Sequence, residues 1–360
     1  MLPHTESESG AEQFCCCSAL TLSGLLKKET RGFWRLERGF RMGKYILKRI
    51  MMFIPMALLM SFLIYGGIEL APGDYVSSMI SPDMAAQMTP EQLEVLREAY
   101  GLNDPFIVRY GKWLLQVLQG NWGYSLSSGV PVKDIIMQKL PITLELALTG
   151  LLISAVLGSL FGVISALKRG SIADHALSVA GVIGLSIPQF FFGMVAILVF
   201  ALNLKILPVG GRTTPEMVHW WEHLRYLILP AGVLGLTQTA SVMRYARSSM
   251  LDSMHKDYVK TARSKGLPEW RVNLVHGFRV SMTPVVVLLA LRIPFLISSS
   301  VVIENVFQWP GIGVTFKEAV TASNYPLVMM IALIMVLLVL VVSLLLDILT
   351  RVLDPRVKLN

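Results

Sequence analysis

Cysteine is almost absent from this chain of 360 residues, and its three copies are adjacent: Cys15, Cys16 and Cys17. Neighbouring cysteines cannot build a disulfide framework, and no further ligands at a suitable spacing lie nearby to complete a metal site. A lipoprotein signal would place an apolar run before the cysteines, but Glu12 and Gln13 stand there. The cysteines therefore indicate neither a disulfide-rich fold nor a lipid anchor.

The sequence also lacks the common catalytic motifs. No GxxxxGK[ST] loop occurs, and the nearest string, Gly39 to Lys44, is too short and is followed by Tyr45. HExxH and GxSxG are absent too. His219 and His223 have the i,i+4 spacing of metal ligands but no third ligand nearby, which favours an interface role. We predict no catalytic residue, no metal site and no cofactor.

Charged residues are few, at 16%, whereas hydrophobic residues make up 54% of the chain. A membrane-spanning helix needs about 20 apolar residues. The sequence contains six such runs, and Pro188 predicts a kink in the third. We therefore predict an all-α, polytopic membrane protein with six transmembrane helices. The runs cover residues 51–70, 141–167, 175–202, 226–243, 282–303 and 325–349.

The charges that are present predict the orientation. Residues 72–140 carry five Lys/Arg against seven Asp/Glu, a balance that suits an external segment. Short basic segments precede the first run, follow the second at residues 168–170, and follow the last. Because basic loops stay inside, we predict that both termini are cytoplasmic. The net charge of +8 fits anionic membrane lipid and a cytoplasmic partner rather than nucleic acid, since most of it flanks apolar runs.

Two short helices are predicted in the external segment. Thr89 and Gln92 form a capping box around Pro90, and Gly101 ends the first helix. Asp104 opens the second helix, which carries one apolar face and ends at Gly120. That face lies either on the membrane or, the more common arrangement, against other external segments. Its members are Phe106, Tyr110, Trp113, Leu114 and Val117.

The most patterned stretch is the basic segment between the fourth and fifth runs, residues 244–284. It carries eight Lys/Arg against three acids. A helix here would end at Gly266 in a left-handed cap, and Pro268 would open a second helix. The two helices would meet in a Gly-Leu-Pro elbow, and each has an apolar stripe, of which the second is expected to be buried. The stripes are Leu251, Met254, Tyr258 and Ala262 in the first, and Trp270, Leu274 and Phe278 in the second.

This segment, DYVKTARSKGL, resembles the EAA loop of ABC-transporter permeases. The closest pattern is that of the dipeptide/oligopeptide/nickel branch, roughly DYVRTARAKGL followed by a histidine, here His276. Ser264 replaces the usual alanine, and Val280 stands where an asparagine is common. The resemblance extends over about residues 42–357, including the closing Asp-Pro-Arg. The matching residues are Asp257, Tyr258, Thr261, Ala262, Arg263, Lys265, Gly266 and Leu267.

The resemblance implies a transport subunit that does not hydrolyse ATP. It implies four kinds of partner: a second homologous permease, two cytoplasmic ATP-binding subunits, an external solute-binding protein and a peptide substrate. Nickel or another small solute is the alternative substrate, and a stand-alone secondary transporter is a weaker alternative, because no clear repeat and essentially one mid-span charge are seen. It further implies a bacterial or archaeal cell membrane. The residues expected to couple to the ATPase are Asp257, Tyr258, Ala262, Arg263, Lys265, Gly266 and Leu267.

Four regions follow from these observations. Residues 1–41 are a disordered extension or an over-called start, and residues 42–140 hold the first span and the external segment. Residues 141–350 form the permease core, and residues 351–360 form a cytoplasmic tail.

Arg292 is the mid-span charge. It lies ten residues after Met282, about 15 Å along a helix and near the middle of the apolar core. An arginine there costs roughly 2.5–3.5 kcal/mol on insertion scales, so it should not face lipid. Glu304 is too far along the helix to pair with it, whereas Gln238 is a possible partner. Arg292 either lines the translocation path or fixes helix packing by a hydrogen bond.

We predict that deletion of residues 1–41 leaves membrane insertion and solute uptake unchanged. These residues lack the apolar content to fold alone and precede the family-like start at Met42. Quantitative membrane blots and uptake assays of the truncated chain test this, and a loss of either property would contradict it.

Overall fold

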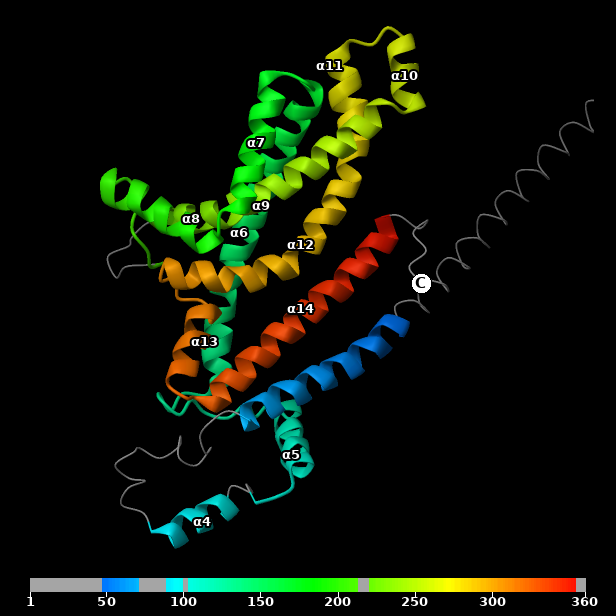
Figure 1. Ribbon diagram of the computed structural model, residues 1–360. Helices are drawn as coiled ribbons and strands as arrows, with labels where there is room; N and C mark the ends of the chain where they lie inside the picture. The colour runs from blue at the N-terminus through cyan, green and yellow to red at the C-terminus, as the bar shows by residue number, and fades with distance from the viewer. Residues whose placement is uncertain (1–46, 71–88, 100–102, 213–219, 354–360) are drawn as a thin grey trace, which may run out of the picture. The chain divides into compact units, whose positions relative to one another are not determined.

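The computed structural model describes residues 47–70, 89–99, 103–212 and 220–353 (Figure 1). Within these ranges every regular element is a helix, apart from an isolated bridge between Tyr124 and Pro131. The predicted all-α class is confirmed. The whole of the predicted extension 1–41, Gly101 and most of the predicted tail 351–360 lie outside the described residues.

Five helices are long and apolar enough to cross a membrane, and a bent pair of helices makes a sixth crossing if it counts as one span. The chain forms two compact units, residues 1–56 and 57–360, of which the first contributes only the start of the helix Leu47–Glu69. The other long helices are α6 (Val132–Leu167), α9 (Trp220–Met254), α12 (Phe278–Val306) and α14 (Tyr325–Leu353).

The third span is not the kinked helix that the sequence predicted. It consists of α7 (Ile172–Ser186) and a second piece, α8 (Gln189–Ala196) with the π-helix η1 (Ile197–Asn203), bent by 104°. The bend lies at Pro188, as expected, but it is far larger than a proline kink. A residue before proline avoids the helical region, and Ile187 accordingly is extended, at φ −82° and ψ 126°. Two consecutive extended residues break the helix rather than bend it (Figure 1).

Small residues on α6 bring it into close contact with α9. The buried face of α6 includes Gly150, Ser154, Gly158 and Gly162, each four residues after the one before. The stripe of large side chains two residues out of phase is exposed. Gly158 and Gly162 form a GxxxG motif, the pattern that lets helix backbones approach inside a membrane. The exposed stripe comprises Leu148, Leu152, Val156 and Leu160.

Two spans are longer than their apolar runs. The predicted fourth span ends at Met243, but α9 continues to Met254. The predicted fifth span begins at Met282, but its helix runs without interruption from Glu269. The hydropathy pattern missed these extensions because charged and polar residues, Arg244 and Arg247 in one and Arg271 and Asn273 in the other, interrupt the apolar runs there. Other charged residues also lie within the long helices, outside or near the ends of the predicted runs: Glu145 on α6, Asp174 on α7, Arg244 and Arg247 on α9, and Glu304 on α12.

Both helices predicted in the segment 72–140 are present. In α4 (Pro90–Ala99) the backbone N–H of Thr89 donates to Gln92 at 3.0 Å, and that of Gln92 donates to Thr89 at 3.3 Å, which confirms the capping box. The aromatic face of α5 (Phe106–Leu118) packs on the helix Leu47–Glu69, where Phe106 and Tyr110 meet Phe62 edge-on. This face is therefore covered by a spanning helix.

A buried carboxylate joins the end of α12 to α13 (Ile312–Thr321). Glu304 is fully buried, and its carboxylate accepts a 2.6 Å hydrogen bond from the backbone N–H of Gly313. The adjacent N–H of Ile312 donates to the Thr143 hydroxyl of α6 at 2.8 Å. Gly311 leaves the room that Glu304 occupies, since a Cβ there would lie 2.5 Å from the carboxyl carbon. The start of α13 is thus held by two side chains from different spans.

We expect Glu304→Ala to destabilise the folded chain by roughly 1–3 kcal/mol, because it leaves buried N–H groups without an acceptor. Thermal unfolding of the purified protein in detergent measures this loss. Glu318→Ala is the matched control, since Glu318 is exposed on α13. Equal unfolding midpoints for the two variants would contradict the role of Glu304.

Candidate functional site: the helical elbow and the α9–α12 pocket

The basic segment folds into the predicted elbow, whose first arm is α10 (Asp257–Ser264). Gly266 has φ +72°, which confirms the left-handed cap, and its N–H donates to Arg263 O at 2.9 Å. The N–H of Lys265 donates to Thr261 O at 3.1 Å. Across the elbow, Arg263 binds both carboxylate oxygens of Glu269, at 3.0 and 3.3 Å. The cap and this ion pair fix the angle between the two arms.

The second arm is not a plain α-helix. After the short α11 (Glu269–Arg271) the chain forms a π-helical turn, η2 (Val272–Gly277), which leads into α12. Val272 is fully buried against Val259 and Ala262 of α10. A π-turn has i→i+5 hydrogen bonds, so it shifts the faces that follow relative to an α-helix.

The predicted burial of the second stripe is therefore wrong. Trp270 is 64% exposed, Leu274 51% and Phe278 37%. In α10 the buried residues are Val259 and Ala262, whereas Tyr258 is exposed. Helical periodicity identified apolar faces, but the position of α9 and the π-turn decided which of them is covered.

The elbow is also attached to the end of α9. Ser253 is buried, and its hydroxyl donates to Gly277 O at 3.1 Å and contacts the Tyr258 hydroxyl. A Cβ on Gly277 would lie 3.1 Å from the end of the Met250 side chain. Both arms of the elbow are thus held against the last turns of α9. We therefore expect the elbow and the end of α9 to move together.

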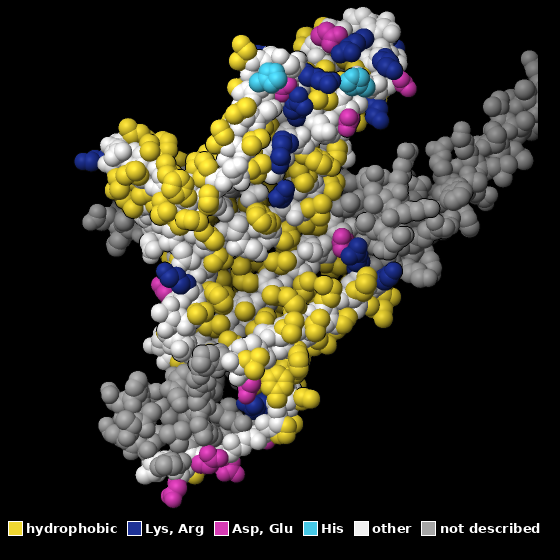
Figure 2. Space-filling model, viewed as in Figure 1, with side chains coloured by type: hydrophobic (Ala, Val, Ile, Leu, Met, Phe, Trp, Pro, Cys, Tyr) yellow, Lys and Arg dark blue, Asp and Glu magenta, His cyan; other side chains and the backbone are white. Residues whose placement is uncertain are grey.

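The predicted coupling residues divide into two groups. Ala262 is buried and Leu267 is partly buried, so both belong to the interior of the elbow. Gly266 sets its angle. The remaining four are exposed: Asp257, Tyr258, Arg263 and Lys265. Figure 2 shows Lys and Arg side chains gathered over α10 and α11, at one end of a broad apolar surface.

A buried ion pair ties three helices together near the elbow. Arg247 of α9 binds both carboxylate oxygens of Asp174 on α7, at 2.9 and 2.8 Å. Ser165 of α6 donates to the same carboxylate, as does the N–H of Gly170 at 3.0 Å. Asp174 is 3% exposed. Motion of α9 at the elbow is thereby linked to the ends of α6 and α7.

At the opposite end of α9, His223 belongs to another ion-pair cluster. Its Nε2 lies 2.6 Å from a Glu145 carboxylate oxygen, and Arg212 donates to the other oxygen at 2.9 Å. The Trp309 ring lies 5.8 Å from the histidine ring. His223 therefore joins α9 to α6, while His219 lies outside the described residues. No group of three metal-ligating side chains occurs within the ranges that the structure describes.

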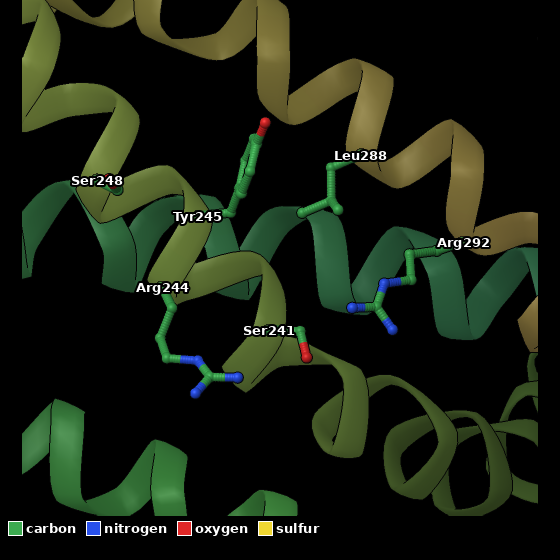
Figure 3. Close-up of a pocket in the computed structure, with 6 residues that line it drawn as sticks. All are labelled: Ser241, Arg244, Tyr245, Ser248, Leu288 and Arg292. Atoms are coloured by element: carbon green, nitrogen blue, oxygen red, sulfur yellow. The ribbon is translucent and has the colours of Figure 1, made fainter.

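Arg292 lies beside a pocket of about 290 Å³ between α9 and α12 (Figure 3). No hydrogen bond joins it to Gln238, its predicted partner, although both residues are described; Gln238 is buried on α9. The guanidinium carbon of Arg292 instead lies 6.0 Å from the centre of the Phe295 ring. The residues that line the pocket are Ser241, Arg244, Tyr245, Ser248, Leu288 and Arg292.

Comparison with known proteins matches this chain to two family descriptions. Residues 42–147 match the N-terminal part of the binding-protein-dependent transport system membrane components. Residues 158–359 match the binding-protein-dependent transport system inner membrane component. The chain belongs to this family. It is therefore a multi-pass membrane permease subunit of an ABC transport system, and not itself an enzyme.

Individual relatives of this permease are similar over nearly their whole length. The oligopeptide transport system permease protein AppB of Bacillus subtilis is 39% identical over 88% of this chain and 100% of its own. The dipeptide transport system permease proteins DppB of Lactococcus lactis and Escherichia coli K12 are 33% and 32% identical, each over 88% of this chain and 100% and 98% of their own. A solved amino acid ABC transporter with histidines has a TM-score of 0.47 at 15% identity, over 61% of this chain and 94% of that chain.

Sequence reasoning about the permease missed several residues. Asp174 and Arg247, or Glu145 and Arg212, lie far apart in the chain, and nothing in their spacing pairs them. Arg244 was assigned to a basic loop because the apolar run ends just before it. A helical reading continued to Met254 would have placed Ser241, Arg244, Tyr245 and Ser248 on one face, since they follow the i, i+3, i+4, i+7 spacing.

Proposed function

We propose that this permease forms part of the membrane path of an ATP-driven importer of dipeptides or oligopeptides. The observation that carries the proposal is its 39% identity to an oligopeptide transport system permease protein, together with full-length similarity to two dipeptide permeases. The path would be completed by a second, homologous permease. An external solute-binding protein would deliver the peptide, and two cytoplasmic ATP-binding subunits would supply the energy.

The elbow is the part proposed to meet an ATP-binding subunit. Its capped arms, its Arg263–Glu269 ion pair and its attachment through Ser253 make it a stiff projection. Its surface combines exposed cations with exposed Trp270 and Leu274, a mixture suited to an interface that excludes water at its centre. On this proposal α10 and α11 lie in the cytoplasm, and both chain termini lie on the same side, as the charge distribution predicts.

Uptake by cells tests the substrate. A strain that lacks this gene should lose the import of labelled di- and tripeptides and regain it when the gene is restored. Labelled nickel in the same strains is the second arm, because nickel is the alternative solute. Loss of nickel uptake with normal peptide uptake would replace the peptide proposal, and unchanged uptake of both would refute import of either.

A further inference from the structure

The α9–α12 pocket presents hydrogen-bonding groups that the protein itself leaves unused. Serines inside spans commonly donate to a carbonyl one turn earlier, as Ser154, Ser299 and Ser300 do here. By contrast, Ser241 and Ser248 make no such bond within the described part of the chain. Both lie on the face of α9 that lines the pocket. Their hydroxyls are therefore free to bind a molecule that enters it.

The same pocket holds two cations without an acid. Two arginines near the pocket's helices do have carboxylate partners: Arg247 of α9 pairs with Asp174, and Arg212, in the loop before α9, pairs with Glu145. Among the residues that the structure describes, no carboxylate lies within ion-pair distance of Arg244 or Arg292. Figure 3 shows the Ser241 side chain between the two guanidinium groups in this view. Two positive charges with adjacent hydroxyl donors form a site for an anion.

The depth of the pocket limits which anion can reach it. Arg292 lies ten residues after the start and eleven before the end of the apolar run 282–303, about 15 Å and 17 Å along the helix. That places it near the middle of the membrane, where an unpaired guanidinium is unfavourable. Lipid phosphates lie at the membrane faces, so a headgroup is a poor counter-ion at this depth. The anion is more readily supplied by the solute that crosses the membrane.

We propose that Arg244 and Arg292 bind the C-terminal carboxylate of the peptide during transport, while the hydroxyls of Ser241, Tyr245 and Ser248 bind its neighbouring amide groups. This inference rests on the proposed function as a peptide importer. A volume of about 290 Å³ accommodates one end of a peptide rather than the whole of it. Because the pocket is open on one side, a peptide end that binds there can also be released.

The test compares labelled trialanine with trialanine amide, which lacks the terminal carboxylate, in cells that contain the complete transporter. We expect Arg244→Gln and Arg292→Gln to lower the ratio of free-acid to amide uptake at least tenfold. The solute-binding protein is the same in every strain, so its own preference cancels from the comparison of ratios. Arg225→Gln is the matched control, because Arg225 is exposed on α9 outside the pocket, and it should leave the ratio unchanged.

A second comparison does not depend on the amide. Arg292→Lys keeps a positive charge and should retain trialanine uptake within about threefold of wild type, whereas Arg292→Gln should lose at least tenfold. If Arg292→Lys takes up no more trialanine than Arg292→Gln does, the proposed carboxylate site is overturned.

The other outcomes identify different occupants. An equal loss of uptake of both peptides would overturn the proposal. The arginines would then pair with a lipid phosphate, pair with an acid of the second permease, or serve in packing. Co-purification of the subunits separates these cases, because failure of the glutamine variants to assemble with the second permease indicates that its acid is the partner. Unchanged uptake of both peptides would remove the pocket from the path. If wild-type cells import neither peptide, the proposed peptide function itself fails, a result that differs from all of these.

Discussion

Replacing Gly266 by valine is expected to abolish peptide uptake while the permease still reaches the membrane. Gly266 has φ +72°, a conformation that costs an ordinary L-residue roughly 1–2 kcal/mol and a β-branched residue more. No atom lies within 4 Å of a Cβ built there, so the effect would come from the backbone and not from crowding. Relief of this strain would rotate the two arms of the elbow against each other. Transport would fail because the two arms could no longer contact the ATP-binding subunit at the same time.

A graded series separates this explanation from a general loss of stability. Asparagine tolerates positive φ, so Gly266→Asn should retain most of the uptake that Gly266→Val loses. Gly120→Val is the matched control, since Gly120 also has positive φ and open space but lies outside the elbow. The measurements are peptide uptake, the amount of permease in the membrane, and ATPase activity with and without the binding protein. Normal uptake by Gly266→Val would contradict the coupling role, and so would equal loss by Gly120→Val.

Replacing Gly162 by leucine is expected to prevent the permease from accumulating in a folded form. A Cβ at Gly162 would lie 2.6 Å from the Ala246 Cβ, 2.7 Å from Met243 O and 3.0 Å from the backbone nitrogen of Arg247. Backbone atoms cannot rotate away as a side chain can, so α6 and α9 would have to separate. Overpacking commonly costs about 1–3 kcal/mol, and separation would also strain the neighbouring ion pair of Arg247.

Alanine gives the controlled version of this experiment. Gly162→Ala adds only the Cβ and should lower the unfolding midpoint in detergent, although alanine is the better helix former by about 1 kcal/mol. Gly232→Ala makes the same change on α9, where a Cβ meets nothing within 4 Å, and it should be neutral or stabilising. If the two alanine variants unfold at the same temperature, close packing of α6 and α9 is not what requires glycine at this position.

Local features of the fold followed from local sequence. The capping box of Thr89 and Gln92 and the left-handed Gly266 each depend on a few neighbouring residues, and both are confirmed. The position of the bend at Pro188 was predicted as well, but its size was not. The apolar runs located all the long helices, because the free energy of moving a segment into the membrane depends on the hydropathy of its own residues. The assignment of residues 1–41 and 351–360 stays a prediction.

The candidate site was predicted only in part. The elbow was found because its residues are contiguous, yet the buried sides of its arms were assigned wrongly at Trp270, Leu274 and Phe278. The pocket was represented by Arg292 alone. Its other cation, Arg244, comes from a different helix, and no periodicity relates the two positions. Gln238, chosen by depth along α9, makes no bond to Arg292.

The sequence alone therefore determined the class, the helices and the family-like segment, since these depend on hydropathy, on caps and on residue order along the chain. Tertiary structure decided the 104° bend, the pairing of Asp174 with Arg247 and of Glu145 with His223, and the meeting of two unpaired arginines. The physical reason is that a membrane helix is apolar on most of its surface. Which face packs inward is then set by shape and by a few polar contacts between distant segments, and these exist only once the helices are assembled.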